Sequence, residues 1–555
     1  MNPLFIQSKF NKTLFLVALA MLFFGCNSKS NNVDYIYFNG QIITMNDSLP
    51  DGSVIVVKNK KIEAIGGNEL LSKYECKAEN KINLNNQIVY PGFIDAHCHF
   101  YGYAKTLLNC DLTKTNSWQQ CIKKLVAFEK EFHPEWIVGR GWDQNDWEEK
   151  EFPNNEMLNK LFANTAVFLQ RIDGHAAICN EKALKLAGID ENTKIVGGEI
   201  IIFKGKLSGV VLDNAADLVK GFIPENSKKD IENALVNAEK NCFSFGLTTL
   251  ADAGLDIETI LEIEKLYKTK KLNIFQYFML NPTDAGFQFA QKNGVVEKDY
   301  LKIGSFKLYA DGALGSRGAK LKTPYCDQKE NSGLLLHSVD YFNEWCAKIA
   351  KMDYQVNTHC IGDSANRLLL EIYGRYLKGK NDRRWRIEHA QVIDPQDFEL
   401  FAKYSIIPSV QPTHATSDGP WAEHRLCSHR LKGAYAYKTL LNQNQYLPLG
   451  TDFPVEGLSP LNTFYSAVFR SDINDIKNKQ FLLNESLSPW EALQGITTWA
   501  AKSCKLEHRK GQLAKGMDAD FVVLNKNLLN IRAEDFKQIK VLFTVLGGNV
   551  VYKRR

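Results

Sequence analysis

What the 555-residue sequence lacks excludes several classes of protein. Its lysines are scattered rather than gathered into blocks and the net charge is only +5, so nothing supports a nucleic-acid-binding surface. The apolar run at 14–24 has eleven residues, whereas a helix needs about 20 to span a bilayer. With 45% hydrophobic and 24% charged residues, the composition is that of a globular protein whose length allows more than one domain.

A close-spaced cysteine framework is also missing. Of the twelve cysteines, eleven remain when Cys26 is set aside, and that number is odd. Most of them stand singly inside apolar stretches, as do Cys179, Cys242, Cys346 and Cys504. We therefore expect buried free thiols rather than disulfides.

The first residues have the features of a secretory signal. Lys9 and Lys12 precede the apolar run, which ends at Gly25 and Cys26. This ending resembles the bacterial lipobox, in which the cysteine is lipidated and becomes the mature N-terminus; an ordinary cleaved signal is the alternative. We expect a signal peptide at 1–25, a lipid-anchored tether at 26–32, and export to the bacterial cell envelope, where the lipid on Cys26 holds the protein to a membrane.

Both ends of the remaining chain read as short strands and turns. Alternating β-branched residues flank turn residues in 33–90, and the same pattern of strands and turns recurs after residue 505. Two β-rich ends around a different middle predict one small β-sandwich domain built from 33–90 and 505–555.

Between them, short apolar runs alternate with longer helical patterns, which is typical of an α/β protein with a parallel sheet. Eight such units predict a (β/α)₈ barrel of the triosephosphate-isomerase (TIM) type over 91–504. The long gap after the first strand predicts an inserted segment at about 110–240 that caps the active site. The candidate strands are 93–100, 247–253, 273–280, 305–311, 355–362, 386–392, 407–414 and 446–454.

Ligand-type residues stand near the ends of several of these strands. His97 and His99, two apart on the first strand, share one face. His359, His389 and Asp452 end the fifth, sixth and eighth strands, at the edge where barrel enzymes keep their active sites. A structural histidine explains any one of them, but their coincidence favours a divalent-metal centre.

Several motifs occur in an order that resembles the amidohydrolase superfamily, and most closely its branch with the N-substituted formamide deformylases (amidohydrolase family 3). The resemblance runs from about residue 35 to 550. Besides the His359, His389 and Asp452 segments, it is carried by 92–99 (GFIDAHCH), 139–144 (GRGWDQ), 173–177 (DGHAA) and 307–316 (KLYADGALGS).

The resemblance implies a centre of two metals, with zinc favoured over manganese, iron or cobalt. His97 and His99 would hold the more buried metal beside Asp452, and His359 and His389 the second. Lys307 matches a position where many members carry a carboxylated lysine that bridges the metals. The alternative is an unmodified Lys307 that pairs with Asp311 or lies near one metal.

The same resemblance gives weaker candidates around the barrel mouth. Trp142, Asp143, Asp173 and Asp311 would contact substrate, and His414, at the end of the seventh strand, is a further candidate for this role by its position. His175 would act in catalysis by donating a hydrogen bond to the substrate carbonyl or oxyanion. Purely structural roles are the alternatives for His175, fixed by Asp173, and for His414 as a loop anchor.

A metal-activated water with Asp452 as general base predicts hydrolysis of amide-type carbon–nitrogen bonds, other than peptide bonds, in small molecules. Two alternatives remain open. One is a one-metal deaminase of the same superfamily, against which Lys307 argues. The other is a non-catalytic binding lipoprotein, against which the intact ligand residues argue. No feature predicts an oligomeric state.

Overall fold

The computed structural model describes residues 31–46, 48–49, 51–144, 147–171, 176–195, 198–203, 205–315, 317–474 and 480–555. The expected signal peptide, Cys26, Asp173 and His175 lie outside these ranges. Among the described helices, none is both long and apolar enough to cross a membrane.

The centre of the molecule is a curved sheet of seven parallel strands that are neighbours in chain order. Nearly every residue in them is buried, as expected for parallel strands covered on both faces. A short strand, β18 (Val296–Glu297), pairs antiparallel with the fourth. The seven strands are β9 (Phe93–Cys98), β16 (Leu247–Leu255), β17 (Phe275–Leu280), β19 (Leu301–Tyr309), β20 (Gln355–Cys360), β21 (Arg386–His389) and β22 (Ile407–Ser409).

The segment 447–454 closes this sheet. Gly450 N–H donates to the Val410 carbonyl at 3.0 Å on one side, and Ala96 N–H donates to the Leu449 carbonyl at 3.2 Å on the other. The segment is not a regular strand, because Pro448 has no N–H and Asp452 has a φ of +63°. The expected TIM-like barrel is thus confirmed, with an extended segment in place of the eighth strand.

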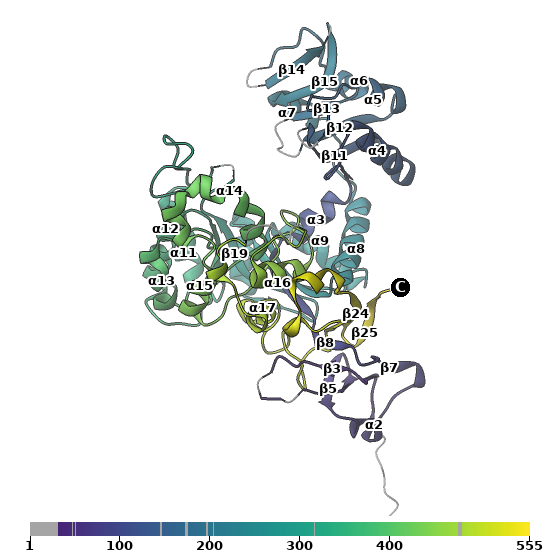
Figure 1. Ribbon diagram of the computed structural model, residues 1–555, viewed down its shortest axis with the longest axis vertical. Helices are drawn as coiled ribbons and strands as arrows, with labels where there is room; N and C mark the ends of the chain where they lie inside the picture. The colour runs from purple at the N-terminus through teal and green to yellow at the C-terminus, as the bar shows by residue number, and fades with distance from the viewer. Residues whose placement is uncertain are drawn as a thin grey trace, which may run out of the picture.

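Helices alternate with the strands and surround the barrel (Figure 1). Their apolar faces pack onto the sheet; in α12, for example, Leu369 and Leu370 are fully buried. The helices of this part are α3 (Phe100–Thr106), α8 (Lys228–Ser244), α9 (Ile257–Lys268), α10 (Asp284–Asn293), α11 (Val339–Ala350), α12 (Asp363–Leu377), α13 (Phe398–Tyr404), α14 (Pro412–Arg430), α15 (Tyr437–Asn444), α16 (Pro460–Phe469), α17 (Pro489–Gly495) and α18 (Thr498–Ser503).

A separate six-stranded sheet falls between the first two barrel strands in sequence, with the order β10-β11-β12-β13-β15-β14. It has hydrophobic cores of its own and stands apart from the barrel at the top of Figure 1. Its elements are β10 (Cys110–Asp111), α4 (Trp118–Phe132), β11 (Trp136–Trp142), α5 (Glu156–Leu161), β12 (Ala166–Arg171), β13 (Ala176–Cys179), α6 (Glu181–Leu186), β14 (Gly198–Phe203), β15 (Lys206–Asp213) and α7 (Asn214–Lys220).

Strands from both chain ends meet below the barrel in Figure 1. One sheet has the order β5-β4-β2-β7 and another β25-β24-β23-β8-β3, and residues of both share one hydrophobic cluster. The strands are β2 (Tyr35–Phe38), β3 (Gln41–Ile42), β4 (Val54–Lys58), β5 (Lys61–Gly66), β7 (Lys81–Asn83), β8 (Ile88–Pro91), β23 (Phe521–Leu524), β24 (Val541–Leu546) and β25 (Asn549–Lys553). The pair β1 (Asn31–Asn32) and β6 (Tyr74–Glu75) lies near α2 (Leu70–Lys73).

One disulfide corrects the cysteine expectation. Cys326, in the loop after β19, is bonded to Cys427 in α14, and their Cα atoms are 5.8 Å apart. The pair was missed because 101 residues separate the two cysteines in sequence; only the barrel brings the loop and the helix together. The expectation of buried free thiols is confirmed for Cys179, Cys242, Cys346 and Cys504.

Candidate metal centre

Three histidines converge at the carboxyl ends of the barrel strands. The ring centroids of His97 and His389 are 4.9 Å apart, and those of His359 and His389 are 4.6 Å apart. Strict alternation along β21 would turn His389 away from Glu388. The left-handed backbone at His389 (φ 72°) and Ala390 (φ 43°) ends the strand and changes this direction.

His97, His389 and Asp452 each offer a ligand atom, and these atoms lie within 4.8 Å of one another. All three residues are buried. Within the described part of the chain, His389 Nδ1 and His359 Nε2 are buried without a hydrogen-bond partner. Buried polar atoms are rarely left without a partner, and imidazole nitrogens beside a carboxylate suit zinc or a similar cation. The residues present therefore fit a divalent metal.

The electrostatics of the cluster keep its imidazoles neutral, the form that binds metal. Burial, together with the Lys307 ammonium, lowers the pKa of His97 to about 4 and that of His359 to about 3. Burial also lowers the pKa of His389. Burial alone would raise the pKa of Asp452, but the hydrogen bond with His414 and the nearby ring of His99 hold it well below its usual range.

His99 and Lys307 border the same cluster. His99 Nε2 lies 3.2 Å from Asp452 Oδ1, on a side chain that remains 29% exposed. Lys307 is fully buried, with its Nζ 3.3 Å from His97 Nε2 and above the Tyr309 ring. The structure thus brings all the expected metal-ligand residues to one end of the barrel.

Asp311 holds the loops of this rim together. Its carboxylate accepts hydrogen bonds from the main-chain N–H groups of Ile361, Gly362 and Lys320, at 2.8–3.0 Å. It also lies 3.7 Å from His359 Nε2. Because the backbone occupies this carboxylate, its placement favours a structural role over substrate contact. Among the described residues, no ion pair joins Asp311 to Lys307, so of the two options for an unmodified lysine only a position near one metal stays open.

His414 reaches the centre from the start of α14. Its Nε2 lies 3.1 Å from Asp452 Oδ2, and its Nδ1 lies 3.4 Å from Glu456 Oε1. Burial alone would lower the pKa of His414, but Asp452 and Glu456 outweigh it and raise the pKa to about 10. A protonated His414 therefore links two carboxylates. The sequence reasoning missed Glu456, whose only signal is its position four residues after Asp452.

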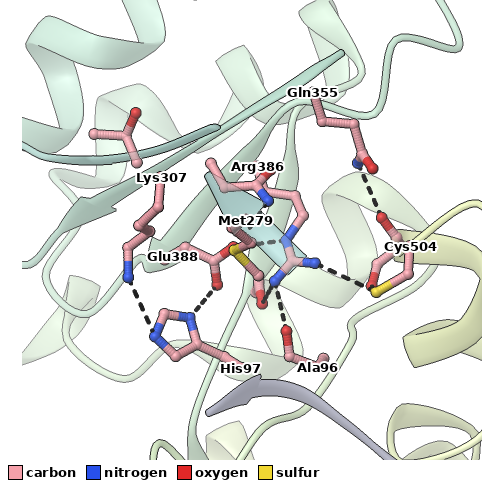
Figure 2. A network of polar contacts seen from close by, with 12 residues as sticks. Ala96, His97, Met279, Lys307, Gln355, Arg386, Glu388 and Cys504 are labelled. Carbon is pink, nitrogen blue, oxygen red and sulfur yellow. Dashed lines mark hydrogen bonds and ion pairs between the residues drawn. The ribbon is translucent and has the colours of Figure 1, made fainter. Parts of the chain in front are cut away.

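Glu388 was also missed. Figure 2 shows it between His97 and Arg386, with Oε2 2.6 Å from His97 Nδ1 and Oε1 2.6 Å from Arg386 Nε. All three side chains are fully buried. Two opposite charges at alternate positions of a buried strand share one face, and burying either charge without the other would be costly. That pattern was visible in the sequence.

Two of the residues expected in the inserted segment, Trp142 and Asp143, are described, and the contacts below are with other residues of that sheet. Trp142 is fully buried in a core of that sheet, where its indole N–H donates to the Leu169 carbonyl at 2.8 Å. Asp143 forms an ion pair with Arg171 at 2.5 Å. The placement of Trp142 does not support contact with a substrate at the barrel.

Neutral imidazoles and a carboxylate at the carboxyl rim of a TIM-like barrel define the centre of a metal-dependent hydrolase. Comparison with known proteins gives the family. The amidohydrolase family model matches residues 81–552, and the chain belongs to this family.

Three relatives illustrate the range of similarity. The chain is 30% identical over 527 residues to the putative amidohydrolase YtcJ of Bacillus subtilis, covering 94% of this chain and 99% of that one. The crystal structure of an uncharacterized metal-dependent hydrolase from Pyrococcus furiosus matches with a TM-score of 0.73 and 25% identity, covering 89% and 100%. The N-substituted formamide deformylase of Arthrobacter pascens is 22% identical, covering 94% and 98%. These matches support the superfamily, and the expected branch stays a prediction.

Proposed function

We propose that this protein is a metal-dependent amidohydrolase that cleaves non-peptide carbon–nitrogen bonds of small amides. The observation that carries the proposal is the buried convergence of His97, His389 and Asp452 at the barrel rim. The similarity to a putative amidohydrolase and to a metal-dependent hydrolase supports it.

The expected ligand sets would hold two metals: His97, His99 and Asp452 for one, and His359 with His389 for the other. A carboxylated Lys307 would bridge them, which its burial and its position 3.3 Å from His97 Nε2 support. A divalent metal at this place, with zinc favoured, acidifies water and polarises a carbonyl.

Proton transfer falls to Asp452. Its Oδ1 lies 3.5 Å from His97 Nε2 and 3.2 Å from His99 Nε2, where it can take a proton from the attacking water and pass it to the leaving amine. Its Oδ2 is bonded to His414. A protonated His414 favours the ionised carboxylate, so Asp452 begins the reaction as a base.

N-formyl and N-acyl amines are the proposed substrates. The similarity to an N-substituted formamide deformylase supports this class. The test is a panel of N-formyl amines, N-acyl amines, N-acyl amino acids and dipeptides, run on protein whose metal content has been measured. Release of amine from the amides and not from dipeptides supports the proposal; turnover of dipeptides alone contradicts it.

A one-metal deaminase is the second candidate. The group formed by His97, His389 and Asp452 takes ligands from both expected metal positions, which favours a single ion. One equivalent of metal together with ammonia release from an amino-substituted ring would select this candidate.

We also propose that Cys26 anchors the protein to a membrane of the bacterial cell envelope after export. The lipobox-like ending of the apolar run supports this. The disulfide between Cys326 and Cys427 adds support, because such bonds persist in oxidising compartments.

For the domain boundaries we propose those that the sequence predicts. A β-sandwich domain from 33–90 and 505–555 is supported by the hydrophobic cluster shared by the two end sheets. The barrel spans 91–504, and the sheet within 110–240 is proposed to close over its mouth.

A further inference from the structure

We infer that Glu388 is a positioning residue of the metal centre: it fixes the tautomer and the orientation of His97, so that Nε2 is presented for metal binding. The inference rests on the proposed metal-dependent function. It adds a residue outside the expected ligand set, with a role that its contacts define.

The contact that carries the inference is short and enclosed. Glu388 Oε2 lies 2.6 Å from His97 Nδ1, and both side chains are 0% exposed. The two residues come from β21 and β9, which are separated in the barrel by β22 and the closing segment. The contact therefore crosses the barrel interior instead of joining neighbouring strands.

Arg386 fixes the carboxylate from the other side. Its Nε lies 2.6 Å from Glu388 Oε1, and one of its terminal nitrogens donates to the Ala96 carbonyl at 2.6 Å and to Ser409 Oγ at 3.2 Å. Figure 2 shows this chain of contacts from Arg386 through Glu388 to His97. Because Ala96 precedes His97, the guanidinium holds both the carboxylate and the strand that carries the imidazole.

One tautomer of His97 follows from this arrangement. A carboxylate only accepts hydrogen bonds, so Nδ1 must carry the proton that lies between it and Glu388. The Nε2 lone pair then faces Lys307 Nζ at 3.3 Å and Asp452 Oδ1 at 3.5 Å, on the side of the ligand cluster. A carboxylate behind a metal-binding imidazole fixes its orientation and raises its basicity.

A purely structural ion pair would use the carboxylate only for Arg386. Here one oxygen serves Arg386 and the other serves a ligand residue. The two roles can be separated by experiment because they place different demands on the side chain. A structural role needs charge near Arg386; a positioning role needs an acceptor that reaches His97.

The test measures Zn²⁺ affinity of the apo-protein by competition with a chromophoric chelator, and the visible spectrum of the Co²⁺-loaded protein. Glu388→Gln removes the charge. Glu388→Asp keeps the charge beside Arg386 and withdraws the carboxylate from His97 by one methylene group. Both should bind Zn²⁺ about 10- to 100-fold more weakly and change the Co²⁺ spectrum. Glu239→Gln, a buried glutamate bonded to the main chain of Asn273 and Ile274, is the control and should match wild type.

Zn²⁺ affinity within twofold of wild type and an unchanged Co²⁺ spectrum in both variants would overturn the inference. If neither variant folds, ¹⁵N-histidine NMR of the wild-type apo-protein shows which ring nitrogen of His97 carries the proton. The His97 signals are assigned by their loss in His97→Gln. Protonation of His97 at Nδ1 is expected, and protonation at Nε2 overturns the inference. Absence of Zn²⁺ binding by wild type would instead contradict the proposed function, while the tautomer still tests Glu388.

Discussion

The main-chain N–H of Asp452 donates a hydrogen bond of 2.8 Å to the carbonyl of His97. Two residues of the ligand cluster, one on the first strand and one on the closing segment, are thus joined through their backbones. Asp95 strengthens the link, since its carboxylate accepts from the N–H of His97 at 3.1 Å and from the hydroxyl of Thr451 at 2.7 Å. Asp452 holds a left-handed conformation, uncommon for a residue other than glycine, and this contact helps to keep it there.

His389→Ala should lower metal content and abolish hydrolysis while the barrel stays folded. The strands stabilise the barrel, whereas the residues at their carboxyl ends bind and act on ligands. Metal analysis, circular dichroism and turnover on the same preparation check this. The exposed His508, which pairs with Glu297, supplies a control as His508→Ala. Full activity of His389→Ala in metal-replete buffer would refute the assigned site.

Asp452→Asn should keep most of its metal and lose kcat by about a hundred- to ten-thousand-fold, because the amide keeps the shape of the side chain without its basicity. Metal stoichiometry and kcat are measured together. Asp382→Asn, at a largely exposed carboxylate, is the control. Turnover within a few-fold of wild type by the metal-replete variant would mean that another residue moves the proton.

Lys307→Ala should lose bridged metal, because a carbamate on the buried amine is the proposed bridging ligand. A short carboxylic acid such as acetate or propionate should restore part of the metal and of the activity by replacing the missing oxygens. Metal content is titrated against added acid. Equal metal content in wild type and variant, with no response to acid, would exclude the bridge.

Loss of the disulfide should destabilise the protein without changing its metal content. Closing a long loop stabilises a fold by about 2–4 kcal/mol, and here the loop spans 101 residues. Denaturant unfolding of a variant with both Cys326→Ser and Cys427→Ser checks this against Cys76→Ser, a free and half-buried thiol. Reduced wild type should unfold like the double variant; identical curves for oxidised and reduced wild type would contradict the expectation.

Cys26→Ser should release the protein from the membrane fraction or leave its signal uncleaved, because the thiol is the proposed attachment point of the lipid. Cell fractionation and the mass of the mature N-terminus check this. A variant that fractionates and migrates like wild type would exclude the anchor.

The barrel and most of its rim were predictable because they depend on local patterns. Apolar runs of strand length recur between helical patterns, and the ends of such strands must meet in a closed sheet. His97, His359, His389 and Asp452 each stand at such an end, so their convergence follows from topology alone. The eighth strand was harder, because Pro448 and the left-handed Asp452 leave it extended without regular pairing.

The remainder depends on contacts across the fold that no local pattern encodes. The alternation of Arg386 and Glu388 on a buried strand indicates that the two charges pair, but it does not indicate the contact of Glu388 with His97, which crosses the barrel interior between residues 291 apart in sequence. The Cys326 and Cys427 pair needs the loop after β19 to lie against α14. Trp142 belongs to one of the family motifs, yet its neighbours are core residues of the inserted sheet. The hydrophobic pattern of the sequence does not indicate where this sheet lies relative to the barrel.

The link between Asp95 and Thr451 joins positions 356 residues apart. During synthesis the first strand leaves the ribosome long before the closing segment exists, so for most of that time His97 has no Asp452 beside it. A chain that stops before residue 447 would keep the four histidines expected as metal ligands and lack Asp452, the carboxylate of the proposed ligand cluster. The proposed metal centre would therefore be complete only when the barrel has closed.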